Sequence, residues 1–308
     1  MKKAVVTGGA GFVGSHLAEE LARRGYQVII LDDLSTGKKE NIEGLTGDKV
    51  DFVQGSVVDL PLLQELFRKI DFVFHLAAIP GVPMSLENPS ASHHANITGT
   101  LNVLLAARDN KVRKVIYASS SSVYGDTPTL PKTEAMLPSP QSPYAVTKLA
   151  GEYYCRVFHQ VYGLPTVCLR YFNVYGPRQD PNSQYAAVIP SFIKRSCEGS
   201  PPVIFGDGEQ TRDFTFVKDA VGATILAAES DACGLFNVSR GESTTINRLA
   251  ELIIELVGNK IQPVYQGPRP GDIRYSLADV SKAKAFGYEP KHNLEAGLTK
   301  TIRWFNDR

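Results

Sequence analysis

Short apolar segments alternate with helical patterns along the first half of the chain, and this alternation restricts the fold more than any other feature of the sequence. The apolar segments are K-A-V-V-T (3–7), Q-V-I-I-L (27–31), K-V-D-F-V-Q (49–54), D-F-V-F-H-L (71–76), K-V-I-Y-A-S (114–119) and T-V-C-L-R-Y (166–171). Helical patterns occupy about 12–24, 88–110 and 142–162. Continuous apolar strands separated by helices are typical of a parallel sheet covered on both faces. The sequence therefore predicts an α/β fold with a doubly wound, Rossmann-like parallel sheet.

The amino-acid composition and the pattern of predicted elements change after Tyr171. Residues 173–215 are rich in Pro, Gly, Asn and Gln, and they include short strand-like pieces and one helical pattern near 188–198. Further helical patterns follow near 217–229 and 245–257. We predict a Rossmann domain over 1–172, to which 213–238 return. A smaller region, formed by 173–212 and 239–308, is expected to cover the substrate.

Composition and charge exclude some classes of protein. Of the 308 residues, 43% are hydrophobic and 21% are charged, as in an ordinary globular enzyme, and Lys+Arg 33 against Asp+Glu 32 leaves a net charge of +1. That balance argues against nucleic acid or an acidic membrane as a partner, and no apolar run approaches the ~20 residues that cross a bilayer. Glycines directly after the first strand argue against a signal peptide. The four cysteines show no C-x-x-C spacing, which favours buried, reduced thiols in a cytoplasmic protein over disulfides or a metal site. His75, in the fourth apolar segment, is expected to be a core histidine rather than a ligand.

The stretch T-G-G-A-G-F-V-G follows the first predicted strand and opens the first predicted helix. It fits G-x-G-x-x-G through Gly9, Gly11 and Gly14, or G-x-x-G-x-x-G through Gly8, Gly11 and Gly14. In either reading, glycines permit a tight turn and let backbone N–H groups approach a pyrophosphate at the helix N-terminus. A tight turn with no ligand is the simpler alternative.

An acidic pair, Asp32 and Asp33, ends the second predicted strand, about where the ribose diol of a dinucleotide is bound. This pair favours a dinucleotide site over a plain turn. Asp32 favours NAD over NADP because an acid repels a 2′-phosphate, whereas the nearby Lys38 and Lys39 weaken that preference. Small residues at 76–78 would let a cofactor lie across the strand ends, although core packing explains them equally well.

A serine run, A-S-S-S-S-V-Y-G (118–125), ends the fifth predicted strand and faces the crevice where α/β sheets bind ligands. Tyr144 and Lys148 lie four residues apart near the start of the helix at 142–162, so their Cβ atoms are about 5–6 Å apart on one face. A free tyrosine titrates near ~10, and an ammonium and an oxidised nicotinamide, both positive, would stabilise its phenolate. A serine hydroxyl can hold the same substrate oxygen. The combination predicts that Tyr144 is a base assisted by Lys148, rather than half of an exposed surface pair.

Four motifs together resemble the extended short-chain dehydrogenase/reductases: T-G-G-A-G-F-V-G, the serine run, Y-A-V-T-K and R-Y-F-N-V-Y-G-P-R-Q. Essentially the whole chain is most similar to the nucleotide-sugar 4-epimerases of that family. The resemblance implies a tightly held NAD, a hydride taken from sugar C4, and its return to the other face of a rotated 4-ketopyranose. It places the catalytic residues at Ser120, Tyr144 and Lys148. It also makes 1–172 the NAD-binding domain and the smaller region the nucleotide-sugar site.

The resemblance implies two further sets of residues. The predicted cofactor-binding residues are Gly8, Gly11, Phe12, Val13, Gly14, Asp32, Asp33, Ser35, Thr36, Gly37, Ser56, Val57, Leu76, Ala77, Ala78, Asn96, Ser119, Tyr144, Lys148, Tyr171 and Phe172. The predicted substrate-binding residues are Ser120, Ser121, Tyr144, Asn173, Ala187, Val188, Val203, Ile204, Phe205, Arg212, Arg269, Asp272 and Ser276. Within this second set, Asn173, Arg212 and Arg269 would meet the UDP phosphates.

Positions at which branches of the family differ indicate the reaction and the substrate. Nucleotide-sugar 4,6-dehydratases carry Asp-Glu at 121–122 and UDP-glucuronate decarboxylases carry Glu at 122, where this chain has serines, so simple redox chemistry at C4 remains. UDP-glucuronate 4-epimerases typically carry Thr at Asn173 and Arg at Asp180, and an acid at 180 should repel a substrate carboxylate. Ser276 falls where a large residue narrows the pocket of epimerases confined to unacetylated sugars. A serine there leaves room for an N-acetyl group at C2.

The sequence therefore predicts a UDP-hexose 4-epimerase that acts on UDP-GlcNAc and UDP-GalNAc, and also on UDP-Glc and UDP-Gal. The alternatives are a UDP-glucuronate 4-epimerase and a catalytically silent relative that binds NAD. Ser56 stands where the family usually has an Asp facing the adenine amine, and Pro80 replaces a Lys near the cofactor, so the grip on NAD would be weaker. Relatives commonly dimerise through two long helices, here 88–110 and 142–162, which predicts a homodimer.

Overall fold

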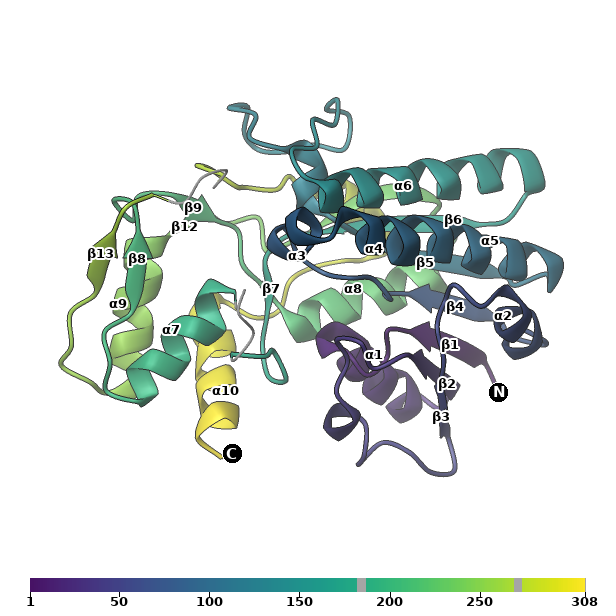
Figure 1. Cartoon of the computed structure of the whole chain (residues 1–308), viewed down its shortest axis with the longest axis horizontal. Helices are drawn as coiled ribbons and strands as arrows, with labels where there is room; N and C mark the ends of the chain where they lie inside the picture. The colour runs from purple at the N-terminus through teal and green to yellow at the C-terminus, as the bar shows by residue number, and fades with distance from the viewer. Residues whose placement is uncertain (182–186, 269–272, 308) are drawn as a thin grey trace.

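One parallel sheet organises the chain in the computed structural model, which describes residues 1–181, 187–268 and 273–307 (Figure 1). Within these residues the sheet has seven strands in the order β11-β6-β5-β4-β1-β2-β3. The strands are β1 (Lys3–Thr7), β2 (Gln27–Asp32), β3 (Val50–Gln54), β4 (Phe72–His75), β5 (Lys114–Ser120), β6 (Thr166–Tyr171) and β11 (Gly234–Val238). Because β2 follows β1 on one side and β4 lies on the other, the sheet has a switch point at β1.

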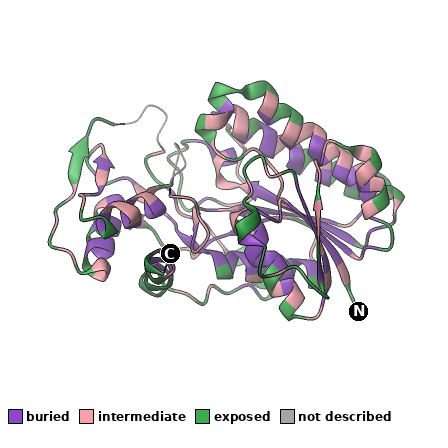
Figure 2. Cartoon of the chain, turned by 60° about the horizontal axis from the view of Figure 1, so that its bottom comes forward, coloured by how far each residue is buried: buried purple, intermediate pink, exposed green. Residues whose placement is uncertain are grey.

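Helices cover both faces of the sheet. Alternate residues of each strand point to opposite faces, so neighbouring residues pack against different helices. Val6 of β1 belongs to a buried cluster with side chains of α1 (Phe12–Arg23) and α8 (Val217–Glu229). Its neighbour Val5 belongs to a second cluster with side chains of α2 (Leu60–Leu66), α5 (Gly99–Asp109) and α6 (Pro143–Tyr162). The central strands of the sheet are mostly buried and the outer helix faces are mostly exposed (Figure 2), whereas the edge strand β3 is partly exposed. The predicted doubly wound sheet is confirmed.

The long helix expected at 88–110 is interrupted. The segment consists of α4 (Pro89–His93), a π-helical turn η2 (His94–Thr98) and α5. The side chain of Asn88 caps α4 by accepting a hydrogen bond from the N–H of Ala91. Within the π-helical turn, buried Asn96 bonds both backbone groups of Ile79, which follows β4. π-Turns of this kind frequently occur at functional sites.

A smaller part of the chain lies beside the carboxyl ends of the strands (Figure 1). Its helices are α7 (Val188–Cys197), α9 (Ile246–Val257) and α10 (Leu294–Asn306). Its short strands form three pairs: β7 (Val174–Tyr175) with β10 (Thr215–Phe216), β8 (Val203–Phe205) with β13 (Val264–Gln266), and β9 (Thr211–Arg212) with β12 (Thr244–Thr245). Side chains of these helices belong to the same buried cluster as α1 and α8, so the two parts share a core. Both α8 and β11 lie within 213–238.

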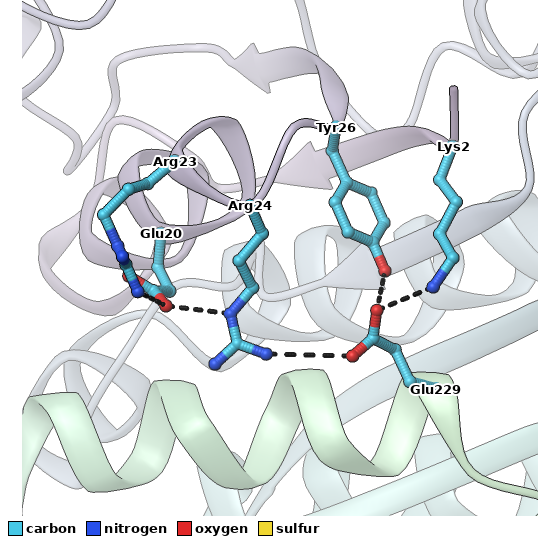
Figure 3. A network of polar contacts seen from close by, with 6 residues as sticks. All are labelled: Lys2, Glu20, Arg23, Arg24, Tyr26 and Glu229. Carbon is cyan, nitrogen blue, oxygen red and sulfur yellow. Dashed lines mark hydrogen bonds and ion pairs between the residues drawn. The ribbon is translucent and has the colours of Figure 1, made fainter.

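The end of α8 is fixed to the start of the chain by a network of polar side chains (Figure 3). A carboxylate oxygen of Glu229 accepts hydrogen bonds from Nζ of Lys2 at 2.7 Å and from the hydroxyl of Tyr26 at 2.6 Å. Arg24 lies 3.7 Å from the other Glu229 oxygen and also donates to Glu20 at 2.8 Å. Burial, reinforced by Glu229, raises the pKa of Tyr26 to about 12. The network therefore joins the residue before β1, the segment that follows α1 and the end of α8.

The cysteines of the chain differ in their exposure to solvent. All four cysteines are free thiols, and Cys155 and Cys168 are buried as expected, but Cys197 is exposed. Cys197 is the last residue of α7, and helix ends commonly face solvent. Among the described residues, no helix is both long and apolar enough to cross a membrane, and no group of three His, Cys, Asp or Glu side chains could hold a metal ion.

Candidate active site

A cavity of about 850 Å³ lies at the carboxyl ends of the strands, around the switch point of the sheet. Ligands of open α/β sheets bind at this position. The glycine loop after β1, the acidic pair after β2, the small residues after β4 and the serines at the end of β5 all contribute to its wall. Tyr144 and Lys148 of α6 contribute as well. Motifs that are far apart in the sequence therefore meet in one cavity.

The glycine loop is shaped so that side chains would block it. Gly8 has a φ of +69°, and a Cβ there would lie 2.7 Å from the backbone nitrogen of Ala77. A Cβ on Gly14 would lie 2.1 Å from the carbonyl oxygen of Gly8. Gly8, Gly11 and Gly14 line the cavity, whereas Gly9 is not among its lining residues. The structure therefore favours the G-x-x-G-x-x-G reading, and the loop leaves the N-terminus of α1 open to an anionic group.

Asp32 stands at the end of β2 on the wall of the same cavity. Its carboxylate accepts hydrogen bonds from the N–H groups of Ala10 and Leu34, both at 2.9 Å. Burial raises the pKa of Asp32 above its ordinary value. A Cβ on Gly37 would lie 2.6 Å from this carboxylate. The loop, the helix N-terminus and an acid at the ribose position are the features that an NAD site requires.

Most of the predicted cofactor-binding residues line the cavity. Those found there are Gly8, Gly11, Phe12, Val13, Gly14, Asp32, Asp33, Ser35, Thr36, Ser56, Val57, Leu76, Ala77, Ala78, Ser119, Tyr144, Lys148 and Tyr171. Gly37, Asn96 and Phe172 are not among the lining residues. Gly37 supports Asp32, and Asn96 is buried beneath the cavity wall and bonds Ile79. Phe172 is fully buried with its ring 6.0 Å from that of Tyr124.

The three predicted catalytic residues face the same cavity. Ser120 ends β5, while Tyr144 and Lys148 lie one turn apart near the start of α6. Nζ of Lys148 lies 5.8 Å from the centre of the Tyr144 ring and donates a hydrogen bond to the carbonyl oxygen of Ala118 at 2.9 Å. One substrate oxygen could therefore be reached by both a phenol and a serine hydroxyl, with an ammonium beside them.

Burial sets the protonation of this pair. Desolvation lowers the pKa of Lys148 to about 8. Burial also raises the pKa of Tyr144, against which a hydrogen bond with Ser120 acts in the lowering direction. The protein alone therefore holds Tyr144 as a neutral phenol. A phenolate there requires added positive charge, and the oxidised nicotinamide of NAD would supply it.

The start of α6 is held by a series of hydrogen bonds. Ser142 caps the helix by accepting from the N–H of Ala145. The N–H of Tyr144 donates to the hydroxyl of Ser85 at 3.0 Å, and Thr147 donates to the carbonyl oxygen of Tyr144 at 2.8 Å. Asn96 in turn donates to Thr147 at 3.0 Å. These contacts fix the backbone that carries the phenol.

A buried ion pair lies one turn further along α6. Glu152 accepts two hydrogen bonds from Arg170 of β6, at 2.8 and 2.7 Å. The hydroxyl of Ser119, on the cavity wall, donates to the same carboxylate at 2.5 Å. The guanidinium of Arg170 lies 4.4 Å from the centre of the Tyr124 ring. The pair therefore joins α6, β5 and β6 directly behind the predicted catalytic residues.

His75, expected to be a core residue rather than a ligand, is 1% exposed. Its Nδ1 lies 2.7 Å from the hydroxyl of Thr7, and its Nε2 lies 2.9 Å from the hydroxyl of Thr100. Thr100 donates its own proton to the carbonyl oxygen of Asn96, so Nε2 must be the donor in that contact. Burial lowers the pKa of His75 to about 3. A neutral core histidine is therefore confirmed.

The predicted substrate residues divide into two groups. Ser120, Ser121, Tyr144 and Asn173 line the cavity. The others in the described part of the chain lie outside its lining: Ala187, Val188, Val203, Ile204, Phe205, Arg212 and Ser276. Ile204 and Ser276 are buried, and Arg212 donates to the carbonyl oxygen of Thr211 at 2.8 Å. Arg269 and Asp272 lie outside the described residues.

Some cavity residues were not predicted from the sequence. Asn41, Met84 and Ile273 line the cavity although no local pattern points to them, and Arg178 lines it as well. Arg178 belongs to the R-Y-F-N-V-Y-G-P-R-Q motif, but the motif did not indicate that this residue lines the cavity. Lys38 and Asp180 also line the cavity, and they form an ion pair with 2.8 Å between Nζ and the carboxylate.

The fold and the cavity together define an NAD-dependent enzyme of the extended short-chain dehydrogenase/reductase class. Comparison with known proteins agrees with this class. The family model described as "NAD dependent epimerase/dehydratase family" matches residues 4–239. The chain therefore belongs to this family, within its group of UDP-sugar 4-epimerases.

Three relatives illustrate the similarity. A solved structure of UDP-N-acetylglucosamine 4-epimerase from Methanobrevibacter ruminantium is 45% identical, with a TM-score of 0.97, and the match covers 99% of this chain and 98% of that chain. UDP-glucose 4-epimerase of Mycolicibacterium smegmatis is 39% identical over 99% of both proteins. A structure of UDP-glucuronic acid 4-epimerase from Bacillus cereus, with UDP-glucuronic acid and NAD, is 36% identical, with a TM-score of 0.92 and 99% of each chain covered.

Proposed function

We propose that the enzyme interconverts UDP-GlcNAc and UDP-GalNAc at C4, and that it also accepts UDP-Glc and UDP-Gal. The observation that carries the proposal is the placing of Ser120, Tyr144 and Lys148 on one wall of the cavity that holds the glycine loop and Asp32. A hydride carrier and an acid/base pair in one cavity are what epimerisation through a 4-keto sugar requires. The high identity to a UDP-N-acetylglucosamine 4-epimerase supports the N-acetylated substrate.

In the proposed mechanism, the glycine loop and Asp32 would hold NAD, which would supply the acceptor for the hydride of sugar C4. Tyr144 removes the proton of the 4-hydroxyl and gives it back after the 4-ketopyranose has rotated. The hydroxyl of Ser120 holds the same sugar oxygen and donates a hydrogen bond to it. Lys148 adds positive charge beside Tyr144, which favours the phenolate against the effect of burial. Small residues on the wall, such as Ala77, leave room for the cofactor.

Three residues bear on the choice of sugar. Ser276 has a small side chain and lies next to β9, where its backbone N–H donates a hydrogen bond to the hydroxyl of Thr211 at 3.4 Å. We propose that this small side chain admits an N-acetyl group at C2 of the sugar. Asp180 disfavours a substrate carboxylate less than the sequence suggested, because Lys38 compensates its charge. Asn173, in place of Thr, remains the feature that favours a neutral sugar over glucuronate.

A product assay tests the proposal. Purified protein with added NAD is incubated separately with UDP-GlcNAc, UDP-Glc and UDP-glucuronate, and the products are separated by anion exchange and sugar analysis. We expect UDP-GlcNAc to give UDP-GalNAc and UDP-Glc to give UDP-Gal, with UDP-glucuronate unchanged. Turnover of UDP-glucuronate alone would assign the enzyme to the alternative 4-epimerase. No turnover of any of the three would favour a silent NAD-binding relative.

We also propose that the protein is a homodimer in which α5 and α6 of each chain pair with those of the other. Large apolar side chains lie exposed along the outer face of α6: Val146, Tyr153, Val157 and Val161. Their spacing of four and seven residues places them on one stripe of the helix. A stripe of this kind fits a second copy of the same helix, since a two-fold interface brings identical surfaces together.

A further inference from the structure

The ion pair between Lys38 and Asp180 connects segments that are far apart in the sequence, and both side chains lie on the wall of the cofactor cavity. Lys38 follows the acidic end of β2, and its backbone N–H donates to the carbonyl oxygen of Ala10 at 3.0 Å. Ala10 lies in the glycine loop and also donates to Asp32. Lys38 is therefore held beside the two elements that bind the adenosine half of a dinucleotide.

A cation at this place affects whether NAD or NADP is bound. In dinucleotide-binding folds, an acid at the end of the second strand binds the 2′-hydroxyl of NAD, and a nearby basic side chain accommodates the 2′-phosphate of NADP. This chain carries both, because Asp32 and Lys38 line one cavity. The sequence alone therefore leaves the cofactor preference only partly determined.

Asp180 reaches Lys38 from the segment after β7, and polar contacts to α1 hold that segment in place. Nε2 of His16 lies 2.8 Å from the carbonyl oxygen of Pro177, and Arg178 donates to Glu19 at 2.6 Å. Both partners, His16 and Glu19, belong to α1, the helix that follows the glycine loop. The position of Asp180 is thus set by the fold around the cofactor cavity.

We infer that Asp180 is a cofactor-selectivity residue, which excludes NADP by pairing with Lys38 and adding negative charge beside the adenosine ribose. The 2′-phosphate of NADP would have to compete with the Asp180 carboxylate for the Lys38 ammonium, and it would also face Asp32. The 2′-hydroxyl of NAD meets neither difficulty. The smaller part of the chain therefore helps to select the cofactor that the Rossmann part binds.

The test is the ratio of the dissociation constants for NADP⁺ and NAD⁺, measured by titration calorimetry on the full-length protein. Because the ratio is taken on one preparation, a fraction of unfolded protein does not change it. We expect Asp180→Asn to lower the ratio about five- to tenfold, as befits an ion pair near the surface. Adding Lys38→Ala to Asp180→Asn should restore the wild-type ratio within about twofold.

Two control variants identify the cation. Lys39 is adjacent to Lys38 but is not among the residues that line the cavity, so Lys39→Ala should leave the ratio unchanged. Arg178 also lines the cavity, and Glu19→Gln would release it from its ion pair. If Glu19→Gln lowered the ratio and Asp180→Asn did not, Arg178 would be the relevant cation and the inference would be overturned. An unchanged ratio in Asp180→Asn would overturn it as well.

Discussion

Tyr144 and Lys148 show how far a residue's chemistry depends on what surrounds it. The spacing of the two residues on one helix predicted that they would meet, and the structure places them on one cavity wall. The spacing could not predict that burial shifts both groups toward their neutral forms. The direction of those shifts follows from desolvation, which only the folded chain produces.

Replacing Tyr144 by Phe should abolish most of the turnover while the cofactor still binds. A general acid/base contributes about 10²–10⁴-fold to the rate, so turnover of the UDP-sugar should fall by at least about 10²-fold. Binding of NAD should change by less than about threefold, because the ring of Phe preserves the shape of the wall. Turnover by product analysis and NAD binding by calorimetry check the two parts.

The matched control for Tyr144→Phe is Tyr153→Phe. Tyr153 lies on the same helix, but its side chain is 52% exposed, and its hydroxyl should contribute nothing to turnover. Wild-type turnover in the Tyr144 variant would remove this residue from the mechanism. Equal losses in both variants would instead indicate damage to α6.

Lys148 should make the stability of the cofactor-free protein depend on pH. Its pKa is lowered from 10.5 to about 8, so between pH 8 and 10.5 the unfolded chain holds a proton that the folded chain has lost. Stability on account of this group therefore rises with pH in that window. At pH 7 the burial of the ammonium destabilises the folded state, and Lys148→Met should raise the free energy of unfolding by about 3 kcal/mol.

Urea unfolding of the cofactor-free protein at pH 7 and pH 9.5 measures this effect. The stability advantage of Lys148→Met over wild type should shrink by about 2 kcal/mol at the higher pH, since wild-type Lys148 is then neutral in the folded state. The same advantage at both values of pH would show that the ammonium is not destabilised by burial. The variant should also lose turnover, whatever its stability.

At the scale of helices and strands, the sequence predicted most of what the structure contains. The six strands with continuous apolar runs are all present, and the helices α1, α6, α7, α8 and α9 lie where their patterns indicated. Among the elements that were not predicted are β11 and α10. The strand β11 carries the buried polar residue Asn237, and the buried face of α10 includes Gly297 and Thr301 beside its apolar residues. Only tertiary contacts distinguish such segments from loops.

The ion pair between Glu152 and Arg170 should matter more for stability than any surface pair. Both side chains are nearly inaccessible, at 7% and 2% exposed. Arg170→Met leaves the carboxylate buried beside Ser119 with one partner, and the loss of one member of a buried pair costs about 3–5 kcal/mol. Urea unfolding should show this loss, and adding Glu152→Gln should recover part of it because the unpaired charge is removed.

Arg23→Met is the control for the buried pair. Arg23 pairs with Glu20 on the surface of α1, and its side chain is 72% exposed, so its loss should change the free energy of unfolding much less than the loss of Arg170 does. Similar losses in Arg23→Met and Arg170→Met would contradict the distinction between the two pairs. A double variant at 152 and 170 that is no more stable than Arg170→Met alone would show that the cost lies in packing and not in charge.

At the scale of the whole molecule, the cofactor side of the cavity was more predictable than the substrate side. Most of the residues predicted to bind NAD follow directly after strands, so the parallel sheet brings them together once its order is known. The predicted substrate residues lie on short strands and loops after Tyr171, and many of them fall outside the lining of the cavity. Ile204, for example, is fully buried. No periodic pattern fixes the path of such segments, so similarity was the only guide to them.

The assembly of the molecule gives the last prediction. If the stripe on α6 binds a second copy, light scattering after size exclusion should give twice the mass of one 33.6 kDa chain. Val157→Asp combined with Val161→Asp places charges on the stripe, and a buried charge without a partner is strongly unfavourable, so this variant should elute as a monomer.

Val264→Asp is the control for the assembly. It changes a valine that is 42% exposed on β13, in the smaller part of the chain, and it should leave the dimer intact. NAD binding should survive in both variants, because neither surface contributes to the lining of the cavity. A monomeric wild-type protein would contradict the proposed assembly. A dimer that withstands the charges on α6 would require a different interface, and the exposed stripe would then need another explanation.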